Sequence, residues 1–228
     1  MIDGIDELIY SKRKCLTLTV VPGGKTVLRV PLKTKEALIE AFLKAHEVWI
    51  VRARQRMASL PPPPAPYQFA HGEQLLYLGK LYPLAVVEKQ PGGLAFLAGQ
   101  GFKLERQRRP EGPKLFERFL REETRRLCQA YLAHYAPLLG AQYGLVRINN
   151  AKTRWGSCSA KNALNFSLRL ALTPLACLEY VAVHELCHTR CHHHGPAFWN
   201  LVEELLPNFR EPRAWLKKHG GSLPPIGE

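Results

Sequence analysis

The amino-acid sequence of 228 residues predicts an α+β protein. Three observations predict this class. A β-hairpin pattern near the N-terminus precedes an amphipathic helix, short strands lie between that helix and a second long one, and the last third reads as a strand followed by helices. A proline-rich run follows the first helix, so we expect a β-rich N-terminal region with one helix, joined through a spacer to the rest of the chain.

The N-terminal region, residues 1–60, begins with the hairpin pattern. Residues 15–31 alternate between apolar and polar types on both sides of Pro-Gly-Gly. Thr34 can cap a helix that runs from about Lys35 to Met57. Seven apolar residues recur near the helical period and predict the buried face of this helix, Trp49 among them: Ala37, Leu38, Ala41, Phe42, Ala45, Trp49 and Ile50.

Residues 61–113 are expected to form a proline-rich linker and short β-strands. The run PPPPAP at 61–66 ends the first helix and favours a stiff polyproline II spacer. Strands are predicted in EQLLYLGKLYPLAVVE and GLAFLAG, with a turn at Gly79-Lys80. A long amphipathic helix from about Lys114 to Tyr135 then begins the third region, residues 114–228. Its predicted inward residues are Leu115, Phe119, Leu127 and Tyr131.

The last third of the chain carries the clearest helix signals. The segment ALNFSLRLAL is predicted to be a strand. Thr173 and Pro174 fit the N-cap and first position of the next helix, LACLEYVAVHELCHTR. Gly195 and Pro196 are expected to start another helix through AFWNLVEELL.

Composition limits the class of protein. The apolar fraction is 46% and the charged fraction 22%, which argues against a disordered or fibrous chain. No run approaches the about 20 apolar residues that cross a bilayer, and the acidic start MIDGIDELIY lacks a signal-peptide pattern, so we expect no membrane association and a cytoplasmic location. The six cysteines are too dilute for a disulfide scaffold. The net charge of +13 suits a polyanionic partner such as nucleic acid or a nucleotide, or simply a solvated basic surface.

The pentad HELCH, residues 184–188, predicts a metal site. On an α-helix His184 and His188 differ by about 40° around the axis and by about 6 Å along it, so both imidazoles can bind one tetrahedral zinc ion. Glu185 lies one position further round, where it can contact a metal-bound water as a general base. The pentad follows an apolar run on a capped helix, which is the structural context that this motif requires.

The third ligand is less determined by spacing. His194 is favoured, because it directly precedes Gly195-Pro196 and a turn there lets it fold back towards the helix. Other possible ligands are Cys191, if the helix continues, and His192, His193, Glu203 or Glu204. The spacing also matches metzincins, but these need a glycine at position 191 and a later methionine, and the only methionines are Met1 and Met57.

Longer segments carry a family resemblance. TRWGSCSAKNALNFSLRLALTP, EYVAVHELCH and HHGPAFWNLVEELLPNFREPRAWL resemble the YgjP-like metallopeptidase family, and the N-terminal RKCLTLTVVPGGKTVLRVP extends the likeness to most of the chain. SprT-type proteases are more distantly similar. The resemblance implies a zincin-like catalytic domain over 114–228, with His184, His188 and His194 as zinc ligands and Glu185 as catalytic base. This sequence departs from the family pattern in three places: Gly195 stands where the family often has serine, Asn162 stands where it often has glycine, and the cluster Cys191-His192-His193 is unusual. None of the three departures removes a catalytic group.

The loop RWGSCS is expected to have a mainly structural role. Cys158 has no accompanying nucleophile-activating residues, so we interpret it as structural, and Trp155 is expected to pack the loop. Arg154 is expected to form a salt bridge or, less readily, to bind substrate. The strand from Asn165 to Leu170 is expected beside the metal helix, as an edge that could pair with an extended peptide.

These observations predict a zinc-dependent metallopeptidase that acts on a peptide or protein substrate. One alternative is a metal-dependent hydrolase of nucleotides or other phosphate esters, although the sequence lacks an evident carboxylate cluster for magnesium. Another is a basic nucleic-acid-binding module with structural zinc, which would require four protein ligands.

Overall fold

The computed structural model describes residues 5–21, 23–58 and 64–227. The chain divides into two compact units, Met1–Pro64 and Ala65–Glu228. Both contain helices and strands, which confirms the α+β class, while the division at residues 60 and 113 stays a prediction. Pro22 of the predicted hairpin turn and residues 61–63 of the predicted polyproline spacer lie outside the described residues. None of the described helices is long and apolar enough to cross a membrane.

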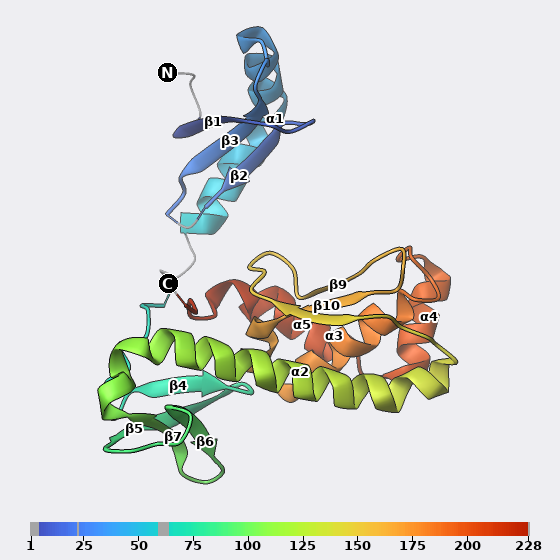
Figure 1. Cartoon of the computed structure of the whole chain (residues 1–228). Helices are drawn as coiled ribbons and strands as arrows, with labels where there is room; N and C mark the ends of the chain where they lie inside the picture. Colours follow the sequence, from blue (N-terminus) through green and yellow to red (C-terminus); the bar gives the residue numbers. More distant parts are fainter. Residues whose placement is uncertain (1–4, 22, 59–63, 228) are drawn as a thin grey trace. The chain divides into compact units, whose positions relative to one another are not determined.

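The first unit is a three-stranded sheet with one helix along it (Figure 1). Strands β2 (Thr17–Val20) and β3 (Thr26–Pro31) form the predicted antiparallel hairpin. Strand β1 (Glu7–Ser11) pairs in parallel with β3, so the sheet order is β1-β3-β2. The helix, α1 (Glu36–Ala58), closely matches the predicted span.

The predicted buried face of α1 is mostly wrong, because only Ile50 of the seven residues is buried and Phe42 is half-buried. The residues that the helix buries are Ile39, Leu43, Ile50 and Ala53, and the first three cluster with apolar residues of β3. Leu38 and Trp49, which were expected inside, are 55% and 44% exposed. The helix carries apolar residues on two faces, and only the sheet decides which face is covered.

The second unit begins with a four-stranded sheet of order β4-β5-β7-β6. Its strands are β4 (Gln74–Tyr77), β5 (Lys80–Val87), β6 (Leu94–Leu97) and β7 (Gly101–Glu105). The turn between β4 and β5 falls at Leu78-Gly79, one residue before the predicted position. Both turn residues have positive φ, 46° and 76°, as a tight two-residue hairpin turn requires.

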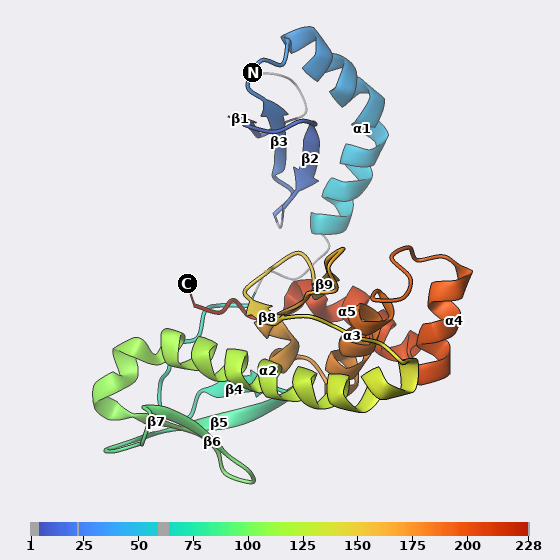
Figure 2. The same ribbon diagram turned by 45° about the vertical axis from the view of Figure 1, so that its right-hand side comes forward.

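A long helix links this sheet to the rest of the unit. After a short 3₁₀ helix (Arg106–Glu111), α2 (Gly112–Leu139) runs from the four-stranded sheet at its N-terminal end to the C-terminal helices, as both views show (Figures 1 and 2). It ends at Gly140, in the left-handed conformation that favours glycine. The predicted inward residues all contact the core: Leu115 is buried, and Phe119, Leu127 and Tyr131 pack against it.

A second, three-stranded sheet has the order β8-β10-β9. It contains β8 (Val146–Asn149), β9 (Gly156–Cys158) and β10 (Leu164–Ser167). The predicted strand therefore ends at Ser167, where a 3₁₀ helix (Leu168–Leu172) follows. The expectation that this strand is an edge is wrong, because β10 pairs with β8 on one side and with β9 on the other. Strand β9 forms an edge instead.

Three helices complete the unit: α3 (Leu175–Cys187), α4 (Pro196–Leu205) and α5 (Arg210–His219), before a final 3₁₀ turn (Gly220–Ser222). Gly195 and Pro196 start α4 as predicted. The N-cap prediction for α3 is wrong by one residue: Pro174 is the cap and its carbonyl accepts the N–H of Cys177, whereas the Thr173 hydroxyl donates to the Leu170 carbonyl.

Candidate metal centre

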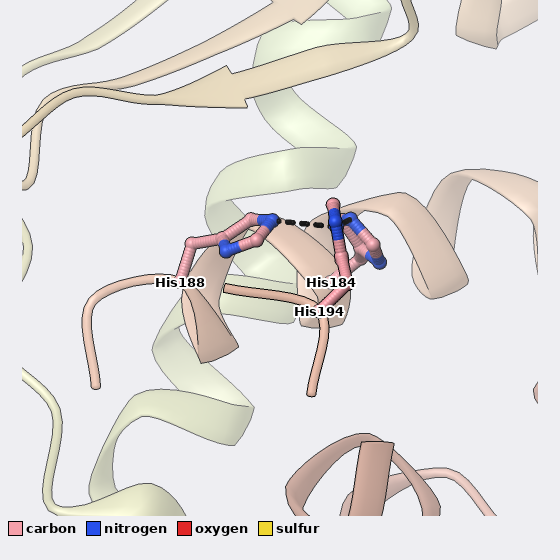
Figure 3. Close-up of side chains that lie close together, drawn as sticks. All are labelled: His184, His188 and His194. Atoms are coloured by element: carbon pink, nitrogen blue, oxygen red, sulfur yellow. Dashed lines mark hydrogen bonds between the residues drawn. The ribbon is translucent and has the colours of Figure 1, made fainter. Parts of the chain in front are cut away.

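Three histidines converge at the C-terminal end of α3. His184 lies in the last turn of the helix and His188 at its C-cap, so the four-residue spacing places both imidazoles on one side. The helix ends there, and the chain returns to place His194 directly before α4. The Nε2 atom of His194 lies 3.1 Å from the Nε2 atoms of both other histidines. Figure 3 shows the three rings turned towards one another.

The spacing of the nitrogens fits a metal ion. A tetrahedral zinc site with Zn–N bonds of about 2.0–2.1 Å places its ligand nitrogens about 3.3 Å apart. Each histidine offers one ligand atom, and these three atoms all lie within 4.8 Å of one another. Among the described residues, this is the cluster of His, Cys, Asp or Glu side chains that could hold a metal ion. The residues present therefore suit a single ion held by three imidazoles.

The protonation of two of the rings also suits metal binding. Nδ1 of His188 lies 3.0 Å from the Cys191 carbonyl, to which it can only donate, so the neutral ring has its lone pair on Nε2. Nδ1 of His184 lies 3.4 Å from the Tyr180 hydroxyl. Burial, then the neighbouring imidazoles and the charge of Arg213, lower the pKa of His184 to about 3, and burial lowers the pKa of His188. Both imidazoles are thus kept in the neutral form that binds metals.

Aromatic side chains from α4 hold the imidazoles in place. Phe198 is fully buried and lies 4.5–4.9 Å, between ring centres, from all three histidine rings. Trp199 stacks on His194 at 5.7 Å, and its Nε1 donates to the His194 carbonyl. The loop histidine is therefore positioned by the helix that follows it.

Glu185 lies beside this group with its side chain almost fully buried, 5% exposed. It packs against Gly156 on β9, where an added Cβ would lie only 2.6 Å from Cγ and Oε1 of Glu185. Within residues 5–21, 23–58 and 64–227 no hydrogen bond to its carboxylate is found, and burial raises its pKa to about 8. A carboxyl group with a raised pKa and no fixed partner is suited to exchange protons near neutral pH.

The other residues considered as third ligands lie outside this group. Cys191 contributes its carbonyl to His188, and its thiol is not part of the cluster. His192 and His193 are exposed. Glu203 pairs with Arg210 at 2.6 Å, and Glu204 is exposed.

The RWGSCS loop is placed mainly as expected. Burial, and then the charge of Glu185, raise the pKa of the Cys158 thiol, which argues against a nucleophilic thiolate. Trp155 packs against the core and closely approaches Gly220. Arg154 is exposed, and the described part of the chain supplies no ion pair for it, unlike the expected salt bridge.

Sequence reasoning did not identify three residues around the centre. Tyr180 could have been found from its place one helical turn before His184. Phe198 lies in the segment HHGPAFWNLVEELLPNFREPRAWL that resembles the family, but nothing in the sequence indicated that it lies beside the histidines. Arg213 lies on α5, and no local pattern relates it to the histidines; the guanidinium carbon lies 4.4 Å from the centre of the Trp199 ring.

Comparisons with known proteins place the chain in a family. The model of the family described as "YgjP-like, metallopeptidase domain" matches residues 14–219. One similar solved structure is described as "Crystal structure of the metallopeptidase zymogen of Pyrococcus abyssi abylysin". Its sequence is 26% identical, and the alignment covers 40% of this chain and 93% of that chain with a TM-score of 0.36. A search of curated proteins gave no significant match. Because the family model matches most of the chain, the protein belongs to the YgjP-like metallopeptidase domain family, which supports a metal-dependent peptidase activity.

Proposed function

We propose that this protein is a zinc-dependent peptidase in which His184, His188 and His194 hold the metal and Glu185 is the general base. The observation that carries the proposal is the convergence of three imidazole Nε2 atoms next to a buried carboxyl group. Three nitrogen ligands leave the fourth position of a tetrahedral zinc ion open, which is typical of catalytic rather than structural zinc.

The chain's own residues supply the proton transfers. When bound, zinc supplies a Lewis acid that lowers the pKa of a coordinated water to about 7. Glu185 accepts a proton from the attacking water on a carboxylate oxygen. It then donates this proton to the nitrogen of the leaving amine, which restores the carboxylate for the next turnover. Burial raises the pKa of Glu185 in the metal-free protein, and a cation bound beside it would favour the carboxylate form that accepts the proton.

The edge strand β9 is a suitable place for the peptide. Gly156 in β9 contacts Glu185, so a peptide that pairs with this edge would pass close to the general base. This assigns to β9 the pairing role that the sequence suggested for the strand around Asn165.

The first prediction concerns metal content. The His194→Ala variant is expected to lose stoichiometric zinc and all chelator-sensitive peptide hydrolysis, because it removes one of three ligands. His193→Ala and Cys191→Ser are matched controls from the same loop and should keep both. Elemental analysis and a quenched fluorescent peptide provide the measurements.

Two outcomes would contradict this proposal. Zinc retained at full occupancy by His194→Ala would remove this residue from the ligand set. Chelator-sensitive hydrolysis of nucleotides, with none of peptides, would favour the phosphate-ester alternative.

The second prediction concerns Tyr180. Its hydroxyl can accept the Nδ1 proton of His184 and so keep Nε2 free for the metal. Tyr180→Phe is expected to weaken zinc affinity by about tenfold, at the lower end of the effect of removing such outer partners. A competition titration with a chromophoric chelator measures it, with Tyr82→Phe on β5 as the control; equal affinities in the two variants would exclude this role.

A further inference from the structure

Arg213 is held next to the candidate metal centre by an aromatic side chain. Its guanidinium carbon lies 4.4 Å from the centre of the Trp199 ring. Trp199 also contacts His194: the two rings stack at 5.7 Å, and the indole N–H donates to the His194 carbonyl. One side chain thus joins Arg213 to a candidate ligand.

The aromatic platform under Arg213 is itself well packed. Trp199 stacks on the buried Phe209 at 5.5 Å and 17°, and Phe209 stacks on Tyr180 at 6.3 Å and 18°. A cation over an aromatic face is attracted to it, while the N–H groups at the edge of the planar guanidinium stay available for hydrogen bonds. The contact therefore orients Arg213 without using its donors.

A second arginine on α5 provides the contrast. Arg210 also lies over an aromatic ring, that of Phe209, at 4.9 Å, but it forms an ion pair with Glu203 at 2.6 Å. Arg213 is exposed, and within the described ranges its guanidinium has neither an ion pair nor a hydrogen bond. Of these two neighbouring arginines, Arg213 is the one whose guanidinium N–H groups are available to bind a ligand.

We propose that Arg213 is a specificity residue that binds a carboxylate of the substrate, so that the peptidase prefers peptides with an acidic group near the cleaved bond. This inference rests on the proposed peptidase function. A guanidinium binds a carboxylate through two parallel hydrogen bonds, a geometry that a neutral amide cannot match. The net charge of +13 acts in the same direction, because it attracts acidic peptides to the surface.

The test compares matched peptides with zinc-loaded full-length protein. Quenched fluorescent peptides carry Glu or Gln at each position around the cleaved bond, and each is made with a free and an amidated C-terminus. Wild-type protein is expected to show a kcat/KM at least about tenfold higher for the acidic member at one position, the size expected for a hydrogen bond to a charged group. Preference for Glu identifies a side-chain carboxylate; preference for the free terminus identifies the terminal one.

Variants of Arg213 then assign the preference to this residue. Arg213→Gln is expected to bring the ratio of kcat/KM values for the acidic and neutral peptides close to one. Arg213→Glu is expected to favour a peptide with Lys at the same position. Arg210→Gln is the matched control and should keep the wild-type ratio. A purely structural role for Arg213 would slow both peptides equally and leave the ratio unchanged.

The outcomes that overturn the inference are separate from those that overturn the peptidase function. Equal cleavage of acidic and neutral peptides by the wild type, or a ratio that survives Arg213→Gln, excludes the role of Arg213 alone. If the wild type cleaves none of the peptides, both proposals fail.

Discussion

Replacement of Glu185 by glutamine is expected to lower kcat for peptide hydrolysis by about 10²- to 10⁴-fold, the contribution typical of a positioned general base. The amide cannot take the proton from the attacking water. It has nearly the shape of the carboxyl group, so it keeps the close contact with Gly156 on β9. Because the side chain is not part of the histidine cluster, zinc content should remain that of the wild type.

The control for this variant lies on the same helix. Glu179→Gln alters a carboxylate that accepts a hydrogen bond from Tyr135 and lies outside the histidine cluster, so turnover should be preserved. Steady-state kinetics and elemental analysis of both proteins suffice. A fully active Glu185→Gln protein would exclude the mechanism, whereas loss of zinc from it would assign Glu185 a role in holding the metal.

Removal of the Phe198 ring is expected to have the largest effect on stability. Phe198 is fully buried and contacts the three imidazoles, so Phe198→Ala should lower the free energy of unfolding of the metal-free protein by about 3–5 kcal/mol, the usual cost for a buried phenylalanine. The cavity also frees the histidine rings, so zinc affinity should fall. Denaturant unfolding and a zinc competition titration measure the two effects.

A second buried phenylalanine separates stability from metal binding. Phe166 on β10 is also fully buried, but it has no ring contact with the histidines, so Phe166→Ala should cost a similar free energy of unfolding with a smaller change in zinc affinity. Equal zinc affinities in the Phe198→Ala and wild-type proteins would show that the aromatic packing does not position the ligands.

Local patterns predicted the parts of the structure that depend on near neighbours. The hairpin of β2 and β3 follows from alternation around Pro-Gly-Gly. The pairing of His184 with His188 follows from helical spacing, and the return of the chain at Gly195-Pro196 placed His194 beside them. Each of these features is determined by residues that lie close together in the sequence.

Features that depend on distant segments were missed or were wrong. Which face of α1 is buried is decided by the sheet, because Leu38 and Ile39 are equally apolar and only packing distinguishes them. The central position of β10 depends on β8 and β9, and the approach of Arg213 to Trp199 depends on how α5 packs. Period and propensity carry no information about such contacts.

The hydrogen bond from His188 to residue 191 ends on a main-chain oxygen, so the chemical identity of the side chain at this position is not needed for it. Cys191 is half-buried, whereas Cys187, one helical turn earlier, is fully buried. Once the exposed Cys15 and the half-buried Cys158 have been replaced, the Cys191 thiol offers an attachment point for a fluorescent or spin label three residues from a candidate ligand. A label there would report the arrival of a metal ion or a peptide directly, without a turnover assay.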